Sequence, residues 1–418
     1  MLRAATALLL LTAGCAQKVS RAPTPASFLF VWAGADSTSS DFLGVIDADT
    51  ASPRYGSIVA SVPTGAKSTH PHHTEQEMPA NGHLLANGFH AGHTWLFDLS
   101  DPLHPAIMTS FADVGGYSYP HTYVRLANGN VLATFQRSGE PSGMDDMSHD
   151  MAHKAPPGVH TTGGLVVMDE RGTVIRASSA RDTTISDHRL YPYSVLPIPA
   201  LDVAVSTTTD MDERDSAATS EWVQLWRLSD LKLQRSIALP PGPRKKEHHF
   251  TGEPRLLADG RSVYIHTFMC GLYLLRGIDT PRPTASLVTT FPGENCGVPI
   301  LAGKYWIEPV PSTHSVVSLD VSDPEHPRQV SSISVGSDET PHWLAIDSSG
   351  RRLVLDSGGD TKGNRIFIID LDPATGALKL DERFRDAGAS SPGISLDGKA
   401  WPHGYSGRAN PHGAVFSR

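Results

Sequence analysis

The chain has 418 residues, and its 44 acidic side chains outnumber 35 Lys and Arg residues, which gives a formal net charge of −9. This acidic balance offers no basic surface for nucleic acid, so binding of DNA or RNA is not expected. Hydrophobic residues make up 39% of the chain and charged residues 19%, a composition that excludes global disorder. The 37 glycines and 32 prolines disfavour long helices and favour short strands joined by turns.

The N-terminal residues have the pattern of a bacterial lipoprotein leader. One positive charge precedes an apolar run that is too short for a spanning helix of about 20 residues. Small residues then precede Cys15 as in a lipobox, which predicts a signal peptide at residues 1–14 and acylation of Cys15. Gln17 favours sorting to the outer membrane, and residues 15–27 are expected to form a polar tether. We therefore expect a periplasmic protein with a lipid anchor in the outer membrane; the alternative is ordinary secretion with an incidental cysteine.

The two remaining cysteines, Cys270 and Cys296, have three open interpretations. In an oxidising periplasm they could form one disulfide. They could also be soft metal ligands or buried apolar residues.

From residue 28 onward, short apolar strands alternate with tight turns. An Asn-Gly or Asp-Gly turn between apolar runs is the strongest short-range signal for a β-hairpin. Such turns, together with one Ser-Gly turn, occur at Asn81-Gly82, Asn128-Gly129, Asp259-Gly260, Ser349-Gly350 and Asp397-Gly398. A second recurrent phrase, Asp-Leu-Ser-Asp-Pro at residues 98–102, returns as Asp-Val-Ser-Asp-Pro at residues 320–324.

Similar strand openings recur along the chain and predict its architecture. They fall near residues 72, 121, 193, 250, 298, 342 and 403. Seven multi-stranded units with a period of roughly 40–50 residues, lengthened by loops in places, are typical of a β-propeller. We expect an all-β fold, a seven-bladed β-propeller over residues 28–418, closed by the N-terminal strand Phe28–Ala33. The rival architecture of two β-sandwiches has no linker to divide the chain.

Histidines follow prolines at several of these openings. They are found in Pro71-His72-His73, Pro120-His121, Pro341-His342, Pro402-His403 and Pro411-His412, while His248-His249 opens the fourth unit. Equivalent positions of propeller blades converge at one end of the central channel, so distant histidines could form a ring there. Three or four imidazoles suit Cu, Zn, Fe or Ni. The alternative is a structural role, in which each histidine bonds the backbone of a neighbouring blade.

The insert at residues 139–163 is a second candidate metal site. Its methionines and histidines alternate as Met144, Met147, His149, Met151 and His153. Thioethers are soft ligands suited to Cu(I), and imidazole also accepts Cu(II). Mixed loops of this kind resemble those of periplasmic copper-handling proteins, which predicts transient copper capture. The alternative is a polar loop without a function.

A set of motifs spread over nearly all of residues 28–418 carries a family resemblance. The motifs are Phe30-Val31-Trp32-Ala33-Gly34, Asp41-Phe42-Leu43-Gly44-Val45-Ile46-Asp47, His72-His73-Thr74-Glu75, Gly163-Gly164-Leu165, Pro192-Tyr193-Ser194, Val223-Gln224-Leu225-Trp226, Pro341-His342-Trp343, Trp401-Pro402-His403-Gly404 and Pro411-His412-Gly413. With them the chain resembles the selenium-binding proteins of the 56-kDa type, a family that includes the copper-dependent methanethiol oxidases. The resemblance implies a seven-bladed propeller, in agreement with the repeats.

The resemblance also implies a cofactor and a reaction. By position, copper would be held by a set of histidines with one more nearby, namely His72, His73, His121 and His403, with His342. The implied reaction converts methanethiol, O₂ and water to formaldehyde, hydrogen sulfide and hydrogen peroxide, so the expected partners are a small thiol and O₂. No side-chain base is identifiable.

One position departs from the family pattern. Gly56 occupies the place of the selenium-associated cysteine of animal members, which excludes selenium binding by that residue. The substrate of such a divergent branch can differ, and the alternatives to an oxidase are a non-catalytic propeller that binds copper or a partner, or a hydrolase or lyase with another metal. The sequence leaves the oligomeric state open.

Overall fold

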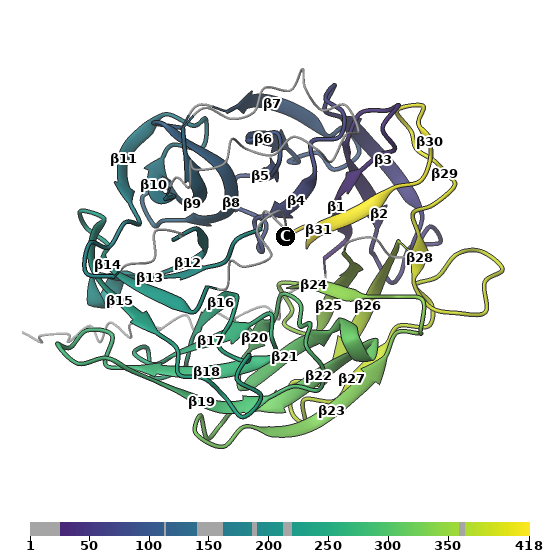
Figure 1. Cartoon of the computed structure of the whole chain (residues 1–418). Coiled ribbons are helices and arrows are strands. Elements are labelled where there is room, and N and C mark those ends of the chain that lie inside the picture. The colour runs from purple at the N-terminus through teal and green to yellow at the C-terminus, as the bar shows by residue number, and fades with distance from the viewer. Residues whose placement is uncertain (1–25, 113, 140–161, 186–189, 212–219, 359–363) are drawn as a thin grey trace, which may run out of the picture.

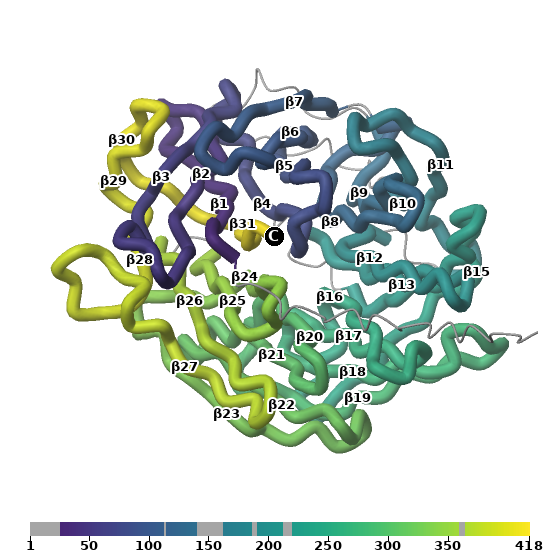
Figure 2. Tube along the Cα trace, turned by 180° about the vertical axis from the view of Figure 1, so that it is seen from behind, coloured from purple at the N-terminus to yellow at the C-terminus, as the bar shows by residue number. Residues whose placement is uncertain are grey.

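Seven sheets of this protein are arranged around one axis as blades, and two short strands at residues 399–400 and 406–407 form a separate small sheet. A computed structural model describes residues 26–112, 114–139, 162–185, 190–211, 220–358 and 364–418. Within these ranges the sheets follow one another in a circle, seen from the front in Figure 1 and from behind in Figure 2. The all-β, seven-bladed β-propeller predicted from the repeats is confirmed.

Each blade is an antiparallel sheet of four strands, and the seventh sheet in chain order has one extra short strand. The strands of the first four blades, apart from the last strand of the chain, are β1 (Phe28–Gly34), β2 (Phe42–Asp47), β3 (Ile58–Pro63), β4 (Pro71–Thr74), β5 (His83–Gly88), β6 (His93–Asp98), β7 (Ala106–Phe111), β8 (Tyr117–Arg125), β9 (Val131–Ser138), β10 (Gly164–Met168), β11 (Val174–Ser179), β12 (Pro192–Ile198), β13 (Val203–Thr208), β14 (Trp222–Arg227) and β15 (Lys232–Ala238).

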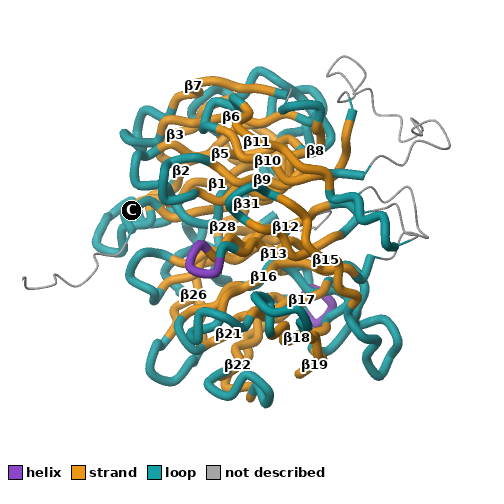
Figure 3. The backbone as a smooth tube through the Cα atoms, turned by 90° about the vertical axis from the view of Figure 1, so that its left-hand side faces the viewer, coloured by secondary structure: helices purple, strands orange, loops and turns teal. Residues whose placement is uncertain are grey.

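The C-terminal half continues the same pattern. Its strands are β16 (Thr251–Leu256), β17 (Val263–Thr267), β18 (Gly271–Arg276), β19 (Thr284–Thr290), β20 (Ile300–Ala302), β21 (Tyr305–Val310), β22 (Ser315–Asp320), β23 (Arg328–Ser334), β24 (Pro341–Ile346), β25 (Arg352–Ser357), β26 (Arg365–Leu371), β27 (Leu378–Leu380), β28 (Ile394–Ser395), β29 (Lys399–Ala400), β30 (Ser406–Gly407) and β31 (Asn410–Phe416). Two short 3-10 helices, η2 (Pro199–Leu201) and η3 (Pro311–Thr313), are small interruptions among strands and loops (Figure 3).

The glycine turns predicted from the sequence connect neighbouring strands of a blade. Gly129 lies between β8 and β9 with φ 85°, and Gly260 lies between β16 and β17 with φ 68°. These left-handed conformations cost glycine little because it has no Cβ. Apolar strands then pack sheet against sheet, and the largest fully buried side chains include Trp32, Trp226, Trp306 and Trp343. The core therefore lies between the blades, and each inner strand is directed along the axis.

The circle is closed by strands from both ends of the chain. β1 pairs with β31 on one side and with β2 on the other, so one blade has the order β3-β2-β1-β31. β31 is the inner strand of this blade, and its end lies at the centre of Figure 1. The expectation that the N-terminal strand closes the last unit onto the first is confirmed.

Six of the seven predicted openings lie at or within two residues of an inner strand, and the seventh was placed wrongly. The inner strand of the closing blade is β31, which contains Pro411 and His412, whereas His403 lies in a turn between β29 and β30. In this turn the backbone N–H of Trp401 donates to Tyr405, and that of Gly404 donates to Trp401. The phrase Pro-His recurs in both segments, so the repeat alone did not distinguish an inner strand from a turn.

Several predicted features fall outside the described residues. Residues 1–25, with Cys15, and residues 140–161, with the methionines and histidines of the insert, are among them. The predicted tether does not extend through residue 27, because Ala26 is already buried and its carbonyl accepts a hydrogen bond from Arg352. No helix of the described part of the chain is long and apolar enough to cross a membrane.

Cys270 and Cys296 form a disulfide. Both are fully buried and pack in one apolar cluster with Leu272 and Trp306. Of the three interpretations left open by the sequence, the structure supports the disulfide, and the bond joins the β17–β18 turn to the segment after β19.

Replacing both cysteines by alanine is expected to lower the free energy of unfolding by about 3–4 kcal/mol, because the bridge closes a loop of 26 residues. Chemical denaturation of the wild type and the Cys270→Ala/Cys296→Ala variant measures this difference. A reducing agent should lower the unfolding midpoint of the wild type and leave that of the variant unchanged. Equal midpoints for reduced and oxidised wild type would contradict the prediction.

Candidate metal centre

Inner strands from four places in the chain bring histidines together at the axis. His72 and His73 lie on β4, His121 on β8, His342 on β24 and His412 on β31. Their ligating nitrogens form three overlapping groups, each with all atoms within 4.8 Å of one another: His72, His73 and His121; His73, His342 and His412; His70, His72 and His412. Six histidines thus form one cluster, which we call the axial cluster.

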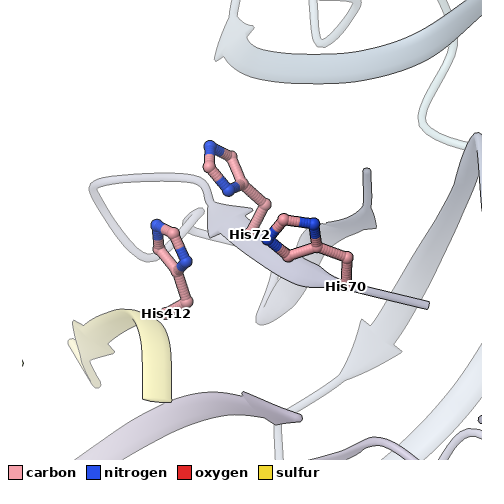
Figure 4. Close-up of side chains that lie close together, drawn as sticks. All are labelled: His70, His72 and His412. Carbon is pink, nitrogen blue, oxygen red and sulfur yellow. The ribbon is translucent and has the colours of Figure 1, made fainter. Parts of the chain in front are cut away.

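Figure 4 shows how the two ends of the chain contribute to this cluster. His70 and His72 extend from the segment that enters β4, and His412 extends from β31 opposite them. The ring centroids of His72 and His412 lie 4.2 Å apart. His70 also contacts His90, with 2.9 Å between their Nδ1 atoms.

His121 has a well-defined orientation within the axial cluster. Its Nδ1 lies 2.7 Å from the carbonyl oxygen of Tyr193, which can only accept, so Nδ1 carries the proton and donates. Its Nε2 is therefore the lone-pair nitrogen, and it lies 3.0 Å from Nε2 of His72. A histidine whose Nδ1 donates to a carbonyl and whose Nε2 presents a lone pair has the usual arrangement of a metal-binding histidine.

Two polar side chains hold the strands that carry the cluster. Asn87 on β5 accepts a hydrogen bond from the backbone N–H of His73 and donates one to the carbonyl of His121, at 3.2 and 2.8 Å. Asp356 on β25 accepts from the backbone N–H groups of Trp343 and Gly413 at 3.1 and 2.7 Å. Asp356 is completely buried, and burial raises the pKa of its carboxyl to about 7. The two contacts join neighbouring inner strands, so the histidines are positioned by backbone rather than by flexible loops.

Glycines leave the space that the imidazole rings occupy. A Cβ at Gly358 would lie 2.7 Å from the ring of His342, and a Cβ at Gly413 would lie 3.0 Å from the backbone nitrogen of Thr74. Gly413 also has φ 122°, a conformation that other residues rarely adopt. Close packing against the neighbouring strand and the unusual backbone conformation thus both explain the glycine in Pro411-His412-Gly413.

The axial cluster is electrically neutral. Burial lowers the pKa of His121 to about 3 and that of His342 to about 4, and it places the pKa values of His72, His73 and His412 well below their usual range. None of the three groups contains a carboxylate. Neutral imidazole is the form that binds metal, so these nitrogens need not lose a proton first.

Several buried nitrogens of the axial cluster have no hydrogen-bond partner. They are Nδ1 of His72 and Nε2 of His73, His342 and His412. Buried polar atoms are normally paired, because leaving one unpaired costs about 1–3 kcal/mol. A metal ion held by several of these nitrogens would satisfy them together, so the residues present fit a copper-type or zinc-type ion.

His403 is the one member of the predicted ligand set that the structure places elsewhere. Its Nδ1 lies 2.7 Å from Oγ of Ser61, on the outermost strand β3, and its ring contacts Phe42. His403 is in none of the three groups of the axial cluster. The structure therefore does not bring His403 to the other predicted ligands, and His412 of β31 lies among them instead.

Sequence reasoning also missed His70 and underrated His266. His70 precedes the Pro-His phrase and has no counterpart in other blades, so repetition gave no signal for it. His266, which follows no proline in the sequence, is fully buried on β17 with its Nδ1 3.5 Å from a carboxylate oxygen of Glu308. Burial raises the pKa of Glu308 well above its ordinary value.

A cavity adjoins the axial cluster at His73. It has a volume of about 700 Å³ and is lined by inner-strand residues that include His73 and Trp343. Ion pairs on its wall join Glu75 to Arg125 at 2.7 Å and Glu253 to Arg255 at 2.8 Å. The cavity is large enough for a small substrate and water beside the histidines.

Comparison with known proteins gives distant relatives. No protein-family model matches the chain. A methanethiol oxidase from Hyphomicrobium sp. is 23% identical over 329 residues, which cover 71% of this chain and 67% of the relative. The structure of a hypothetical selenium-binding protein from Sulfolobus tokodaii has a TM-score of 0.70 at 16% identity and covers 94% of each chain. A putative 6-phosphogluconolactonase from Bacteroides fragilis has a TM-score of 0.61 at 11% identity, covering 96% of this chain and 99% of that chain.

The solved structures support the fold alone, because propellers of one shape carry unrelated functions. The curated relative adds the activity class, since a methanethiol oxidase is an oxidoreductase. Together the relatives confirm the resemblance to methanethiol oxidases and selenium-binding proteins that the motifs indicated.

In the presence of a chelator, the free energy of unfolding should fall as the pH falls below about 6.5 and continue to fall towards pH 3. The unfolded chain binds protons on histidines whose pKa values are lowered in the folded protein, so acid favours unfolding. His121→Asn should reduce this dependence by up to about 1.4 kcal/mol per pH unit. Denaturant titrations at several pH values measure it.

The matched control is His104→Asn, which replaces a side chain that is 81% exposed. This variant should keep the wild-type pH dependence. An equal loss of dependence in both variants would contradict the assignment of the effect to the axial cluster.

Proposed function

We propose that this relative of methanethiol oxidases is a copper-dependent oxidase of a small thiol, with methanethiol as the favoured substrate. The reaction would convert methanethiol, O₂ and water to formaldehyde, hydrogen sulfide and hydrogen peroxide. The observation that carries the proposal is the axial cluster of six histidines, four of them buried, beside a cavity. The methanethiol oxidase relative supports the choice of an oxidoreductase.

The donor set supports copper. Of the divalent ions of the first transition series, copper is bound most tightly by nitrogen sites, and imidazole suits it. Bound copper would supply one-electron redox chemistry between the thiol sulfur and O₂. His72, His73 and His121 would hold it, because they form the group with complete burial and because Nε2 of His121 is already fixed as a lone pair.

The axial cluster contains more histidines than the three proposed ligands. Three or four imidazoles complete a copper site, and the axial cluster has six. His342 and His412 each have an unpartnered Nε2 and lie within ligand distance of His73, so either could complete the ligand set. The aromatic rings of Tyr193 and Trp343 pack against His121 and His73, at 3.9 and 4.7 Å between centroids, and keep that side of the cluster dry.

His72→Ala or His121→Ala should lose bound copper and lower thiol-dependent O₂ uptake by about 100-fold or more, because each removes a ligand. An oxygen electrode with methanethiol, together with metal analysis of the same samples, measures both. Formaldehyde, hydrogen sulfide and hydrogen peroxide should appear in equal amounts.

His403→Ala is the matched control, because His403 has the same Pro-His context and lies outside the axial cluster. It should keep its copper and at least half of the activity. Copper binding without turnover in the wild type would favour the alternative of a non-catalytic copper-binding propeller. Full copper content in both His72→Ala and His121→Ala would refute the ligand assignment.

We further propose that the protein acts in the periplasm, anchored to the outer membrane through a lipid on Cys15. The supporting observation is the leader pattern that ends at this cysteine. Fractionation of the native bacterium, or of a Gram-negative host, should find the wild type in the outer membrane and Cys15→Ala outside it. An unchanged distribution of the variant would exclude the anchor.

A further inference from the structure

A second group of metal-type donors lies away from the axial cluster. Glu221 immediately precedes β14, and His248 and His249 lie in the turn before β16. One ligating atom from each residue lies within 4.8 Å of the other two, and all three side chains are partly exposed. None of the three belongs to the axial cluster. We propose that Glu221, His248 and His249 bind a divalent zinc-type ion at a second, solvent-accessible site.

The donor chemistry supports this choice. Two imidazoles and one carboxylate are a common ligand set for Zn²⁺ with a fourth position left open for water or a substrate. The carboxylate also distinguishes this site from the axial cluster, which contains only imidazoles. The harder oxygen donor and the absence of sulfur disfavour Cu(I). The site therefore differs from the proposed copper site in charge as well as in place.

Within the part of the chain that the structure describes, the three donors are not used by other protein groups. Nδ1 of His248 is buried and has no hydrogen-bond partner. Within the described ranges, the side chains of Glu221 and His249 make no hydrogen bond or ion pair. The neighbouring carboxylate of Glu247, in contrast, is already engaged, because it accepts from the backbone and side chain of Arg244. Glu221 is thus the acid that remains for an ion.

The backbone holds the two donor segments together. The N–H of Phe250 donates to the carbonyl of Ser220 at 2.6 Å, which joins the residue after His249 to the residue before Glu221. The turn itself is closed by the N–H of His249, which donates to Lys246 at 2.9 Å. On the other side, the carbonyl of Glu221 accepts from Leu239. An ion would therefore meet donors whose main chains are already in place, which lowers the entropic cost of binding.

The inner strands run in the same direction, so their starts lie at one end of the propeller. His342 and His412 lie at the starts of β24 and β31, and His249 lies just before the start of β16. The second site consequently opens at the same end of the molecule as the axial cluster.

The test is a titration of the chelated, full-length protein with Zn²⁺, followed by equilibrium dialysis. The wild type should bind one more equivalent than His248→Ala/His249→Ala. Glu221→Gln keeps the size of the side chain and removes its charge. It should lower the affinity for the additional Zn²⁺ ion by about 10-fold or more. Titration with Co²⁺ adds a signature, because the visible absorption of the ion reports its ligands and should differ between the wild type and the double variant.

Two control variants separate this site from other histidines. His104→Ala/His326→Ala removes exposed histidines that each lie beside an aspartate, and it should leave the extra equivalent in place. His149→Ala/His153→Ala removes histidines of the insert and should do the same. The thermal unfolding of every variant is compared with that of the wild type, since the replaced side chains are not part of the core.

The proposal is overturned if His248→Ala/His249→Ala binds as many equivalents as the wild type with the same affinities. It is also overturned if the extra equivalent disappears only in His149→Ala/His153→Ala. The result does not depend on thiol oxidation, so a failure of the proposed activity leaves this test intact, and the reverse also holds.

Discussion

The pairing of β31 with β1 is the constraint on which the rest of this structure depends. β31 is the inner strand of its blade, and it carries His412 to the axis, where His72 and His73 arrive on β4 of the next blade. Without that pairing the circle would be open and two of the three histidine groups would lose a member. Closure of the propeller and assembly of the axial cluster are therefore one event, driven by the burial of apolar strands between blades.

The chemistry of the axial cluster follows from its burial. Burial of imidazoles such as those of His72 and His73 favours their neutral form, and the three groups contain no carboxylate that would favour the charged form. Several of their nitrogens have no protein partner, which is an unfavourable state for a buried polar atom. A bound ion would remove this cost by pairing with the nitrogens. Folding would therefore arrange the nitrogens before an ion binds.

Much of the fold was predictable because propeller blades repeat their turn chemistry. Gly129 and Gly260 mark hairpins through a conformation that glycine adopts most easily, and the Pro-His phrase marks inner strands. The same phrase was misleading at His403, because it describes only two residues and takes no account of what they pack against. His70 has no repeated context, and the group of Glu221, His248 and His249 depends on a contact between segments that are far apart in sequence. Local patterns contain no information on such contacts.

The closing blade also determines when the propeller can close during synthesis of the chain. Its strands come from the first and the last parts of the chain, separated by nearly the whole sequence, so β1 stays without its inner partner until synthesis is complete. The two histidine groups that contain His412 can therefore form only after β31 has been synthesised. A truncated product would expose an unpaired strand edge and lack a complete site, which makes such fragments natural targets for proteolysis.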